Sequence, residues 1–143
     1  MKKIALILLS LLVFIAGCHW GTNREIEQKY PDGSTKVEKY YTYKKGKKEL
    51  VKEVQYFENK QMKMEGYYLN NLRNGKWTAW HKNGKVWSEG FFKDGLSEGI
   101  RTVYHENGNK DMVGRYARDQ KVGKWQFYDN AGKLVKEADY DKK

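Results

Sequence analysis

The side chains best suited to metal chemistry are two histidines and an aspartate that recur at a fixed interval. His81, His105 and Asp129 follow one another at steps of 24 residues, and two imidazoles with one carboxylate form a ligand set that divalent metals accept. If they lie on equivalent strands of successive hairpins, about 9.6 Å separates neighbouring backbones, whereas metal–ligand bonds are close to 2 Å. One ion could not collect all three, so we expect neither a metal site nor a cofactor.

Covalent and acid–base catalysis have equally little support. No serine of the chain sits in a Gly-x-Ser-x-Gly elbow, and the only cysteine lies at the end of an apolar leader. Glu65, Glu89 and Glu137 recur in step with the 24-residue period, and such carboxylates are more economically explained by cross-strand pairing with lysines. The sequence therefore predicts that the protein is not an enzyme and has no catalytic residues.

The aromatic side chains are better candidates for a functional surface. They make up 15% of the chain, including eleven Tyr and five Trp, and exposed aromatic residues among Lys and Arg are typical of a contact patch. The alternative is that these rings serve only to pack a thin sheet, since an isolated hairpin is marginally stable in water. The candidate binding residues are Trp80, Trp87, Phe91, Tyr104 and Tyr128.

The elements that must position these side chains are copies of one hairpin. Residues 75–99 read as a strand, a tight Asn83-Gly84 turn, a second strand and a Gly-bearing loop, after which the pattern starts again. Such a period is typical of repeat proteins in which each unit stacks on the next. We therefore expect an all-β fold, with tandem β-hairpins forming a single-layer curved antiparallel meander. The residues that a 24-residue shift superimposes are Gly66, Gly90, Gly114 and Ala138; Tyr56, Trp80, Tyr104 and Tyr128; and Tyr68, Phe92, Tyr116 and Tyr140.

The Asn83-Gly84 turn also predicts the register of the strands. A two-residue loop at this point fixes which residues face one another. Trp77 would then lie over Gly90, because a large ring fills the gap that a cross-strand glycine leaves in a sheet. The predicted pairs are Ala79 with Ser88, Trp77 with Gly90, Arg101 with Gly114, Trp125 with Ala138 and, on the other face, Trp80 with Trp87.

The first seventeen residues have the three parts of a secretory signal. Lys2 and Lys3 precede an apolar run over residues 4–16, and Ala16 and Gly17 provide a small-residue exit. The run is shorter than the roughly 20 residues that a transmembrane helix needs. We therefore expect residues 1–17 to be a signal peptide that is cleaved.

The sequence Ile15-Ala16-Gly17-Cys18 resembles the lipobox of bacterial lipoproteins, in which the cysteine becomes the lipidated first residue of the mature protein. Cys18 is the only cysteine in the chain, which excludes an intramolecular disulfide and asks for a special role. The alternative is an ordinary signal peptide followed by an incidental cysteine. The resemblance implies a membrane anchor at Cys18 made of acyl chains. Residues 18–28 would be the lipidated cysteine and tether, and residues 29–143 the repeat domain.

The same resemblance implies a location. A lipid anchor places the protein in the bacterial cell envelope, and His19 rather than Asp after the cysteine implies the outer membrane if the host is Gram-negative. The formal net charge of +10 favours anionic surroundings such as lipid headgroups, anionic glycans or acidic proteins. A secreted address argues against nucleic acid. We therefore expect a protein or an anionic envelope component as the partner.

The repeating unit resembles a known motif. Residues 75–95 read Gly-Lys-Trp, an aromatic residue, Asn-Gly-Lys, Glu-Gly with two aromatic residues, and Asp-Gly, which resembles the bacterial variant of the MORN repeat. Residues 123–137 follow the pattern well, residues 99–116 fairly and the units before residue 74 loosely. The resemblance implies hairpins laid side by side, and it assigns no site residues. Bacterial proteins with such repeats are often labelled YwqK-type antitoxins, and eukaryotic relatives are credited with protein scaffolding and phospholipid binding.

Two hypotheses for the function follow. In the first, the protein is a membrane-anchored envelope lipoprotein whose repeat sheet acts as a protein- or anionic-ligand-binding or scaffolding module. In the second, which rests on the resemblance alone, it is an antitoxin or immunity protein that neutralises a partner toxin.

Overall fold

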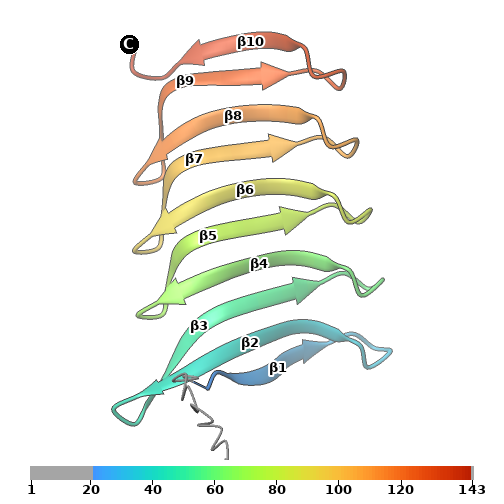
Figure 1. Cartoon of the computed structure of the whole chain (residues 1–143), viewed down its shortest axis with the longest axis vertical. Coiled ribbons are helices and arrows are strands. Elements are labelled where there is room, and N and C mark those ends of the chain that lie inside the picture. Colours follow the sequence, from blue (N-terminus) through green and yellow to red (C-terminus); the bar gives the residue numbers. More distant parts are fainter. Residues whose placement is uncertain (1–20, 143) are drawn as a thin grey trace, which may run out of the picture.

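The computed structural model describes residues 21–142, which form one ten-stranded antiparallel sheet (Figure 1). The strands follow one another in space as they do in the sequence, so the predicted single-layer meander of hairpins is confirmed. Within this range no helix is long and apolar enough to cross a membrane. The predicted signal peptide and Cys18 lie outside the described residues. The strands are β1 (Asn23–Lys29), β2 (Thr35–Lys44), β3 (Lys47–Tyr56), β4 (Met62–Leu69), β5 (Leu72–Trp80), β6 (Val86–Lys93), β7 (Leu96–Tyr104), β8 (Lys110–Ala117), β9 (Gln120–Tyr128) and β10 (Leu134–Asp139).

The sheet begins earlier than the sequence predicted. Residues up to 28 were expected to form a polar tether, yet β1 occupies Asn23–Lys29 and pairs with β2. Most of its side chains are exposed, with Ile26 as its single apolar residue. Charged side chains are a common way to protect an edge strand from pairing with other chains. Because these residues are polar, the alternation of apolar and polar residues that indicates a strand is missing, and β1 was therefore not predicted.

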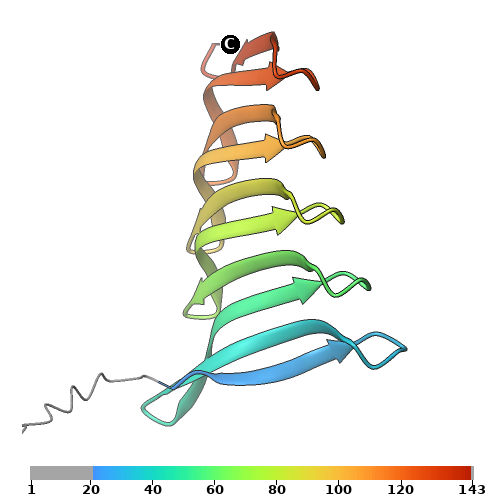
Figure 2. The ribbon, with the colours of Figure 1, turned by 45° about the vertical axis from the view of Figure 1, so that its right-hand side comes forward.

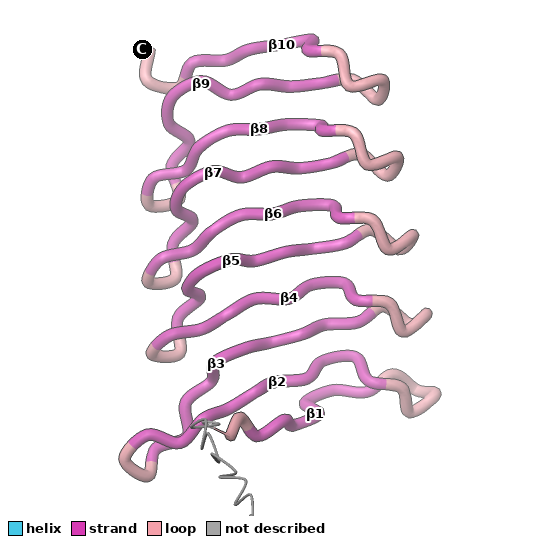
Figure 3. The backbone as a smooth tube through the Cα atoms, viewed as in Figure 1, coloured by secondary structure: helices cyan, strands magenta, loops and turns pink. Residues whose placement is uncertain are grey.

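The turns at the two ends of the strands belong to different classes (Figure 3). At one end, two-residue loops such as Asn70-Asn71 have positive φ at both positions, which is the type I′ geometry. At the other end of the strands each loop has three residues, as between His81 and Lys85. The Gly84 N–H donates to the His81 carbonyl oxygen at 3.0 Å, and the His81 N–H donates to the Lys85 carbonyl oxygen at 2.8 Å. This pattern is a type I turn closed by a glycine bulge, so the predicted two-residue Asn83-Gly84 loop is wrong.

The longer turn changes the register only beside the loop. Away from it, the four predicted pairs that involve Ala79, Trp77, Arg101 and Trp125 are all confirmed. Near the turn a bulge leaves Trp87 without a partner, so that Trp80 pairs with Val86. The predicted Trp80–Trp87 pair is therefore wrong.

Glycines within the strands bend the sheet. Gly75, Gly99 and Gly123 lie inside β5, β7 and β9 with φ of 83°, 80° and 65°. A residue with a side chain would lose roughly 1–2 kcal/mol in this left-handed region. The strand ladder shifts register at the same points, and the resulting curvature of the hairpins is visible in Figure 2.

The register divides the side chains between two faces of the sheet. We name them after one residue each, the Trp77 face and the Glu89 face. The Trp77 face carries Tyr68, Trp77, Phe92, Arg101, Tyr116 and Trp125, whereas the Glu89 face carries Glu38, Val54, Glu65, Thr78, Glu89 and Thr102.

Tryptophans on bare glycine backbone form the core of the Trp77 face. A Cβ atom added at Gly66 would lie 2.0 Å from the Trp77 indole, and one at Gly114 would lie 2.0 Å from that of Trp125. Trp77 is 5% exposed and Trp125 is fully buried. Each ring therefore covers the glycine of the preceding strand. The expectation that Trp77 covers Gly90 is wrong, because both glycines are its cross-strand neighbours and the indole turns toward Gly66.

Other aromatic rings hold the two tryptophans in place. Each indole has two edge-on neighbours, whose ring centroids lie 5.1–5.9 Å away, within the range that favours such pairs. A thin sheet thereby gains a buried layer on one side. The neighbours are Tyr68 and Phe92 around Trp77, and Tyr116 and Tyr140 around Trp125.

Candidate functional site

The five aromatic residues predicted to bind a partner do not form one patch. Trp80, Tyr104 and Tyr128 occupy equivalent, half-buried positions on the Glu89 face. Phe91 belongs to the same face, where it pairs with a lysine and is 50% exposed. Trp87, also 50% exposed, instead lines a groove on the Trp77 face. Trp87 lies at the bulge beside the turn, where it also lines one hollow with Trp80 and another with Tyr104.

The two histidines connect successive hairpins. Nε2 of His81 lies 2.9 Å from the carbonyl oxygen of Tyr104, and Nε2 of His105 lies 3.1 Å from that of Tyr128. Asp129 accepts hydrogen bonds from two backbone N–H groups of its own turn. Across residues 21–142 no three His, Cys, Asp or Glu side chains are grouped to hold a metal. The 24-residue recurrence of these residues thus has a structural cause.

A row of asparagines makes a second set of bonds between hairpins, which the sequence analysis missed. Asn59, Asn83 and Asn107 each donate through Nδ2 to a carbonyl oxygen in the next turn, at 3.2, 3.0 and 2.6 Å. Their Oδ1 atoms accept from N–H groups of their own turns at 2.9–3.1 Å. The signal was present, because the three asparagines also recur every 24 residues.

Glu38 is a deeply buried carboxylate with three partners. It is 2% exposed and accepts hydrogen bonds from Arg24 Nε at 2.6 Å, from the Tyr40 hydroxyl at 2.8 Å and from the Tyr56 hydroxyl at 2.6 Å. Burial raises its pKa, but the bonds from the two tyrosines and the arginine outweigh burial and hold the pKa below its usual value. Burial and the bond to Glu38 raise the pKa of Tyr56. The cluster joins β1, β2 and β3, and its side chains are hydrogen-bonded to one another.

Two ion pairs cross neighbouring strands on the Glu89 face. Lys52 and Glu65 form an ion pair at 2.7 Å, and Lys76 and Glu89 form one at 2.5 Å. Both pairs lie across neighbouring strands, where opposite charges stabilise a sheet. Arg115 and Lys124 are exposed on the same face and form no ion pair within the described residues, so only part of its charge is paired.

On the Trp77 face, cations lie over aromatic rings instead. The Arg73 guanidinium is 4.3 Å from the centre of the Trp77 ring, and the Lys121 ammonium is 4.5 Å from that of Trp125. Arg101 lies between two further rings of the same face. None of these three cations forms an ion pair with a carboxylate within the described part of the chain. The Trp77 face thus presents a row of cations that lie over aromatic rings.

A groove of about 350 Å³ lies across the Trp77 face. Its lining comes from β4 to β8, and it combines apolar side chains with two arginines. Four strand-to-strand steps amount to about 19 Å, so the groove is long for its volume. The lining residues that matter below are Met64, Arg73, Trp87, Arg101, Asp111 and Met112.

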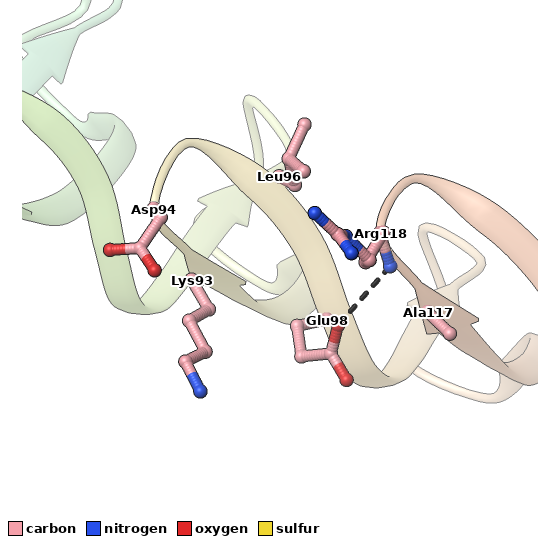
Figure 4. A pocket seen from close by; sticks show the side chains of 6 residues that line it. All are labelled: Lys93, Asp94, Leu96, Glu98, Ala117 and Arg118. Carbon is pink, nitrogen blue, oxygen red and sulfur yellow. Dashed lines mark hydrogen bonds between the residues drawn. The ribbon is translucent and has the colours of Figure 1, made fainter.

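A second hollow, of about 530 Å³, lies beside the two-residue turns that follow β6 and β8 (Figure 4). Its charged residues balance: Lys93 and Arg118 face Asp94 and Glu98. Glu98 also accepts a hydrogen bond at 3.1 Å from the backbone N–H of Arg118, drawn as a dashed line in Figure 4. With no net charge and one carboxylate already engaged, this hollow is a weaker candidate than the groove.

Comparison with known proteins shows which repeat two of the hairpins are similar to. The family model described as MORN repeat variant matches residues 73–94 and 121–142, which contain most of β5 with β6 and of β9 with β10. No curated protein matches the sequence significantly. A solved structure titled "Crystal Structure of TarM" is similar at 18% sequence identity with a TM-score of 0.47, over 82% of this chain and 21% of that one. The chain therefore spans about a fifth of the length of that protein.

Proposed function

We propose that this chain, which carries variant MORN repeats, is a binding or scaffolding module that engages a protein or an anionic envelope component through its Trp77 face. The observation that carries the proposal is the row of cations on that face, Arg73, Arg101 and Lys121, which lie over rings rather than beside carboxylates. An anionic partner meets them without breaking an ion pair. Because the rings already restrict these side chains, less conformational entropy is lost on binding.

Two exposed aromatic residues allow a matched test of which face binds. Trp87, which lines the groove, and Phe91 on the Glu89 face are both 50% exposed, so each can be replaced by a photocrosslinking phenylalanine analogue with little loss of packing. We expect ultraviolet irradiation of living cells to give one discrete protein adduct from position 87 and none from position 91, as read by immunoblot and mass spectrometry.

The reverse pattern, or equal adducts from both positions, contradicts the proposal for the Trp77 face. A toxin as the captured protein, together with rescue of growth when the two proteins are co-expressed, would instead support the antitoxin alternative. A chain that gives no adduct at either position, and no stoichiometric partner in the membrane fraction, would leave the binding proposal without support.

The proposal includes an anchor at Cys18 in the bacterial envelope. It is supported by the sequence Ile15-Ala16-Gly17-Cys18 after an apolar leader. We expect Cys18→Ser to abolish incorporation of radiolabelled palmitate and to shift the protein from the membrane to the soluble envelope fraction, because acyl chains contribute about 0.8 kcal/mol per buried CH₂. His19→Ala, which keeps the cysteine, is the control and should retain the label. A Cys18→Ser protein that stays membrane-bound would contradict the anchor.

A further inference from the structure

The repeat departs from its own pattern at Arg101. Trp77, Arg101 and Trp125 occupy equivalent places, 24 residues apart, on β5, β7 and β9. In the first and last of these places an indole covers a glycine, and in the middle one the arginine does: a Cβ atom at Gly90 would lie 3.1 Å from Arg101 Nε. An arginine here replaces a buried ring by a charged group, so packing alone does not explain it.

The arginine lies between aromatic rings rather than beside a carboxylate, although hydrogen bonds from Ser97 and, to a lesser extent, the charge of the arginine lower the pKa of Asp119. Its guanidinium lies 6.0 Å from the centre of the Phe92 ring and 5.6 Å from that of Tyr116, and within residues 21–142 it forms no ion pair. Asp111 provides the carboxylate in the groove lining, and its Oδ1 atom lies 3.7 Å from Nε2 of His105. A guanidinium is planar and presents its donors in a fork that matches a carboxylate.

The groove around Arg101 offers apolar surface but few free ring faces. Trp77 has the Gly66 backbone against one face and the Arg73 guanidinium over the ring at 4.3 Å. The ring is therefore poorly placed to stack on a sugar or a base. Met64 and Met112 line the same groove beside the half-exposed Trp87, and methionine side chains adapt to apolar groups of many shapes. The lining thus suits a ligand that carries carboxylates and apolar side chains together.

We propose that the groove binds an extended acidic segment of a partner protein, with one carboxylate of the segment on Arg101 and an apolar side chain two residues away, on the same side of the segment, among Met64, Trp87 and Met112. This inference rests on the proposed binding function and names the chemistry of the partner. Charge complementarity and the shape of the groove support it. At roughly 3.3 Å per residue an extended peptide of six residues spans about 20 Å, close to the five strands that the groove crosses.

The test uses isothermal titration calorimetry with the synthetic peptide Glu-Ser-Leu-Ser-Glu-Ser as the probe, called the Glu-Leu hexapeptide, in which Glu and Leu share one side of the extended chain. We expect saturable binding, reduced at least about tenfold by Arg101→Trp, because a charge-assisted hydrogen bond contributes roughly 1.5–3 kcal/mol. Arg101→Trp restores the residue that the pattern places there, so it should fold at least as well as the parent, as circular dichroism and urea unfolding can verify. Arg115→Ala on the Glu89 face removes an exposed arginine and should bind like the parent.

Three results would overturn the inference. The first is equal affinity of the parent and Arg101→Trp for the Glu-Leu hexapeptide. The second is equal binding of a Lys-Leu hexapeptide, which would show apolar contact without charge recognition. The third is Arg101-dependent binding of inorganic polyphosphate or of vesicles containing anionic phospholipid, with no binding of the peptide. If any of these occurs while photocrosslinking at position 87 still captures a protein, the proposed function stands and the acidic segment alone is wrong.

Discussion

Replacing Gly114 with alanine is expected to destabilise the sheet by about 3 kcal/mol, whereas the same change at Gly90 should cost less than about 1 kcal/mol. A methyl group on Gly114 would lie 2.0 Å from the fully buried indole of Trp125, which must leave its site. At Gly90 the nearest atom is 3.1 Å away and belongs to the flexible side chain of Arg101. Neither glycine has a positive φ, so the difference reports packing alone.

The free energy of unfolding of the two variants is measured by urea titration followed by far-ultraviolet circular dichroism. Near-ultraviolet dichroism should show the loss of ordered tryptophan in the Gly114 variant only. Gly66→Ala, in which Trp77 lies 2.0 Å from the added atom, should resemble Gly114→Ala. Equal losses at Gly90 and Gly114 would contradict the description of the tryptophans as rings seated on glycine backbone.

The Glu38→Gln variant is expected to lose about 2–3 kcal/mol of stability at pH 7 in the first three strands, because an amide replaces a buried carboxylate that accepts three hydrogen bonds. The loss should depend on pH. Since the folded-state pKa of Glu38 is lowered, its contribution is complete above the unfolded-state pKa of about 4.3 and disappears as the pH falls through the folded-state pKa. The parent and the variant should therefore converge in acid.

Hydrogen exchange of β1 and β2 at pH 7, together with urea titrations at pH 7 and pH 3, measures both parts of this prediction. In a repeat sheet the loss should stay near the affected hairpins, because each unit contacts only its neighbours. Glu89→Gln is the control: Glu89 is half-exposed in its pair with Lys76, so it should cost no more than about 1 kcal/mol. A difference between parent and Glu38→Gln that is unchanged at pH 3 would contradict the assigned role of the carboxylate.

The 24-residue period was enough to predict the hairpins and most of their pairing. Together with the Asn83-Gly84 turn it placed Trp77 opposite Gly90, and the period carried the same pairing to Trp125 and Ala138. It did not reveal the length of the turn, since an Asn-Gly sequence fits both a two-residue loop and the last two positions of a three-residue loop. Because the loop has one residue more than predicted and a bulge follows at Trp87, Trp80 pairs with Val86.

The candidate site was less accessible from sequence. The rotamer of Trp77 decides which glycine its ring covers, and strand pairing does not determine the rotamer. The sequence therefore could not show that the ring covers Gly66 rather than Gly90. The arginine and lysine that lie over tryptophans four residues later in the chain were missed, although Arg73 and Lys121 both show this spacing. Glu38 gave no signal, because a carboxylate in a strand is ordinarily expected in solvent.

The strand order gives the sheet a specific response to tension. Every strand pairs only with the strands before and after it in the sequence, and the hydrogen bonds between antiparallel strands run perpendicular to the strands, along the length of the sheet. A force that pulls β1 and β10 apart therefore acts along these bonds, and every strand pair carries it in series. We expect such a sheet to lengthen by opening its weakest hairpin first, while the remaining hairpins keep their register, because each unit contacts only its neighbours.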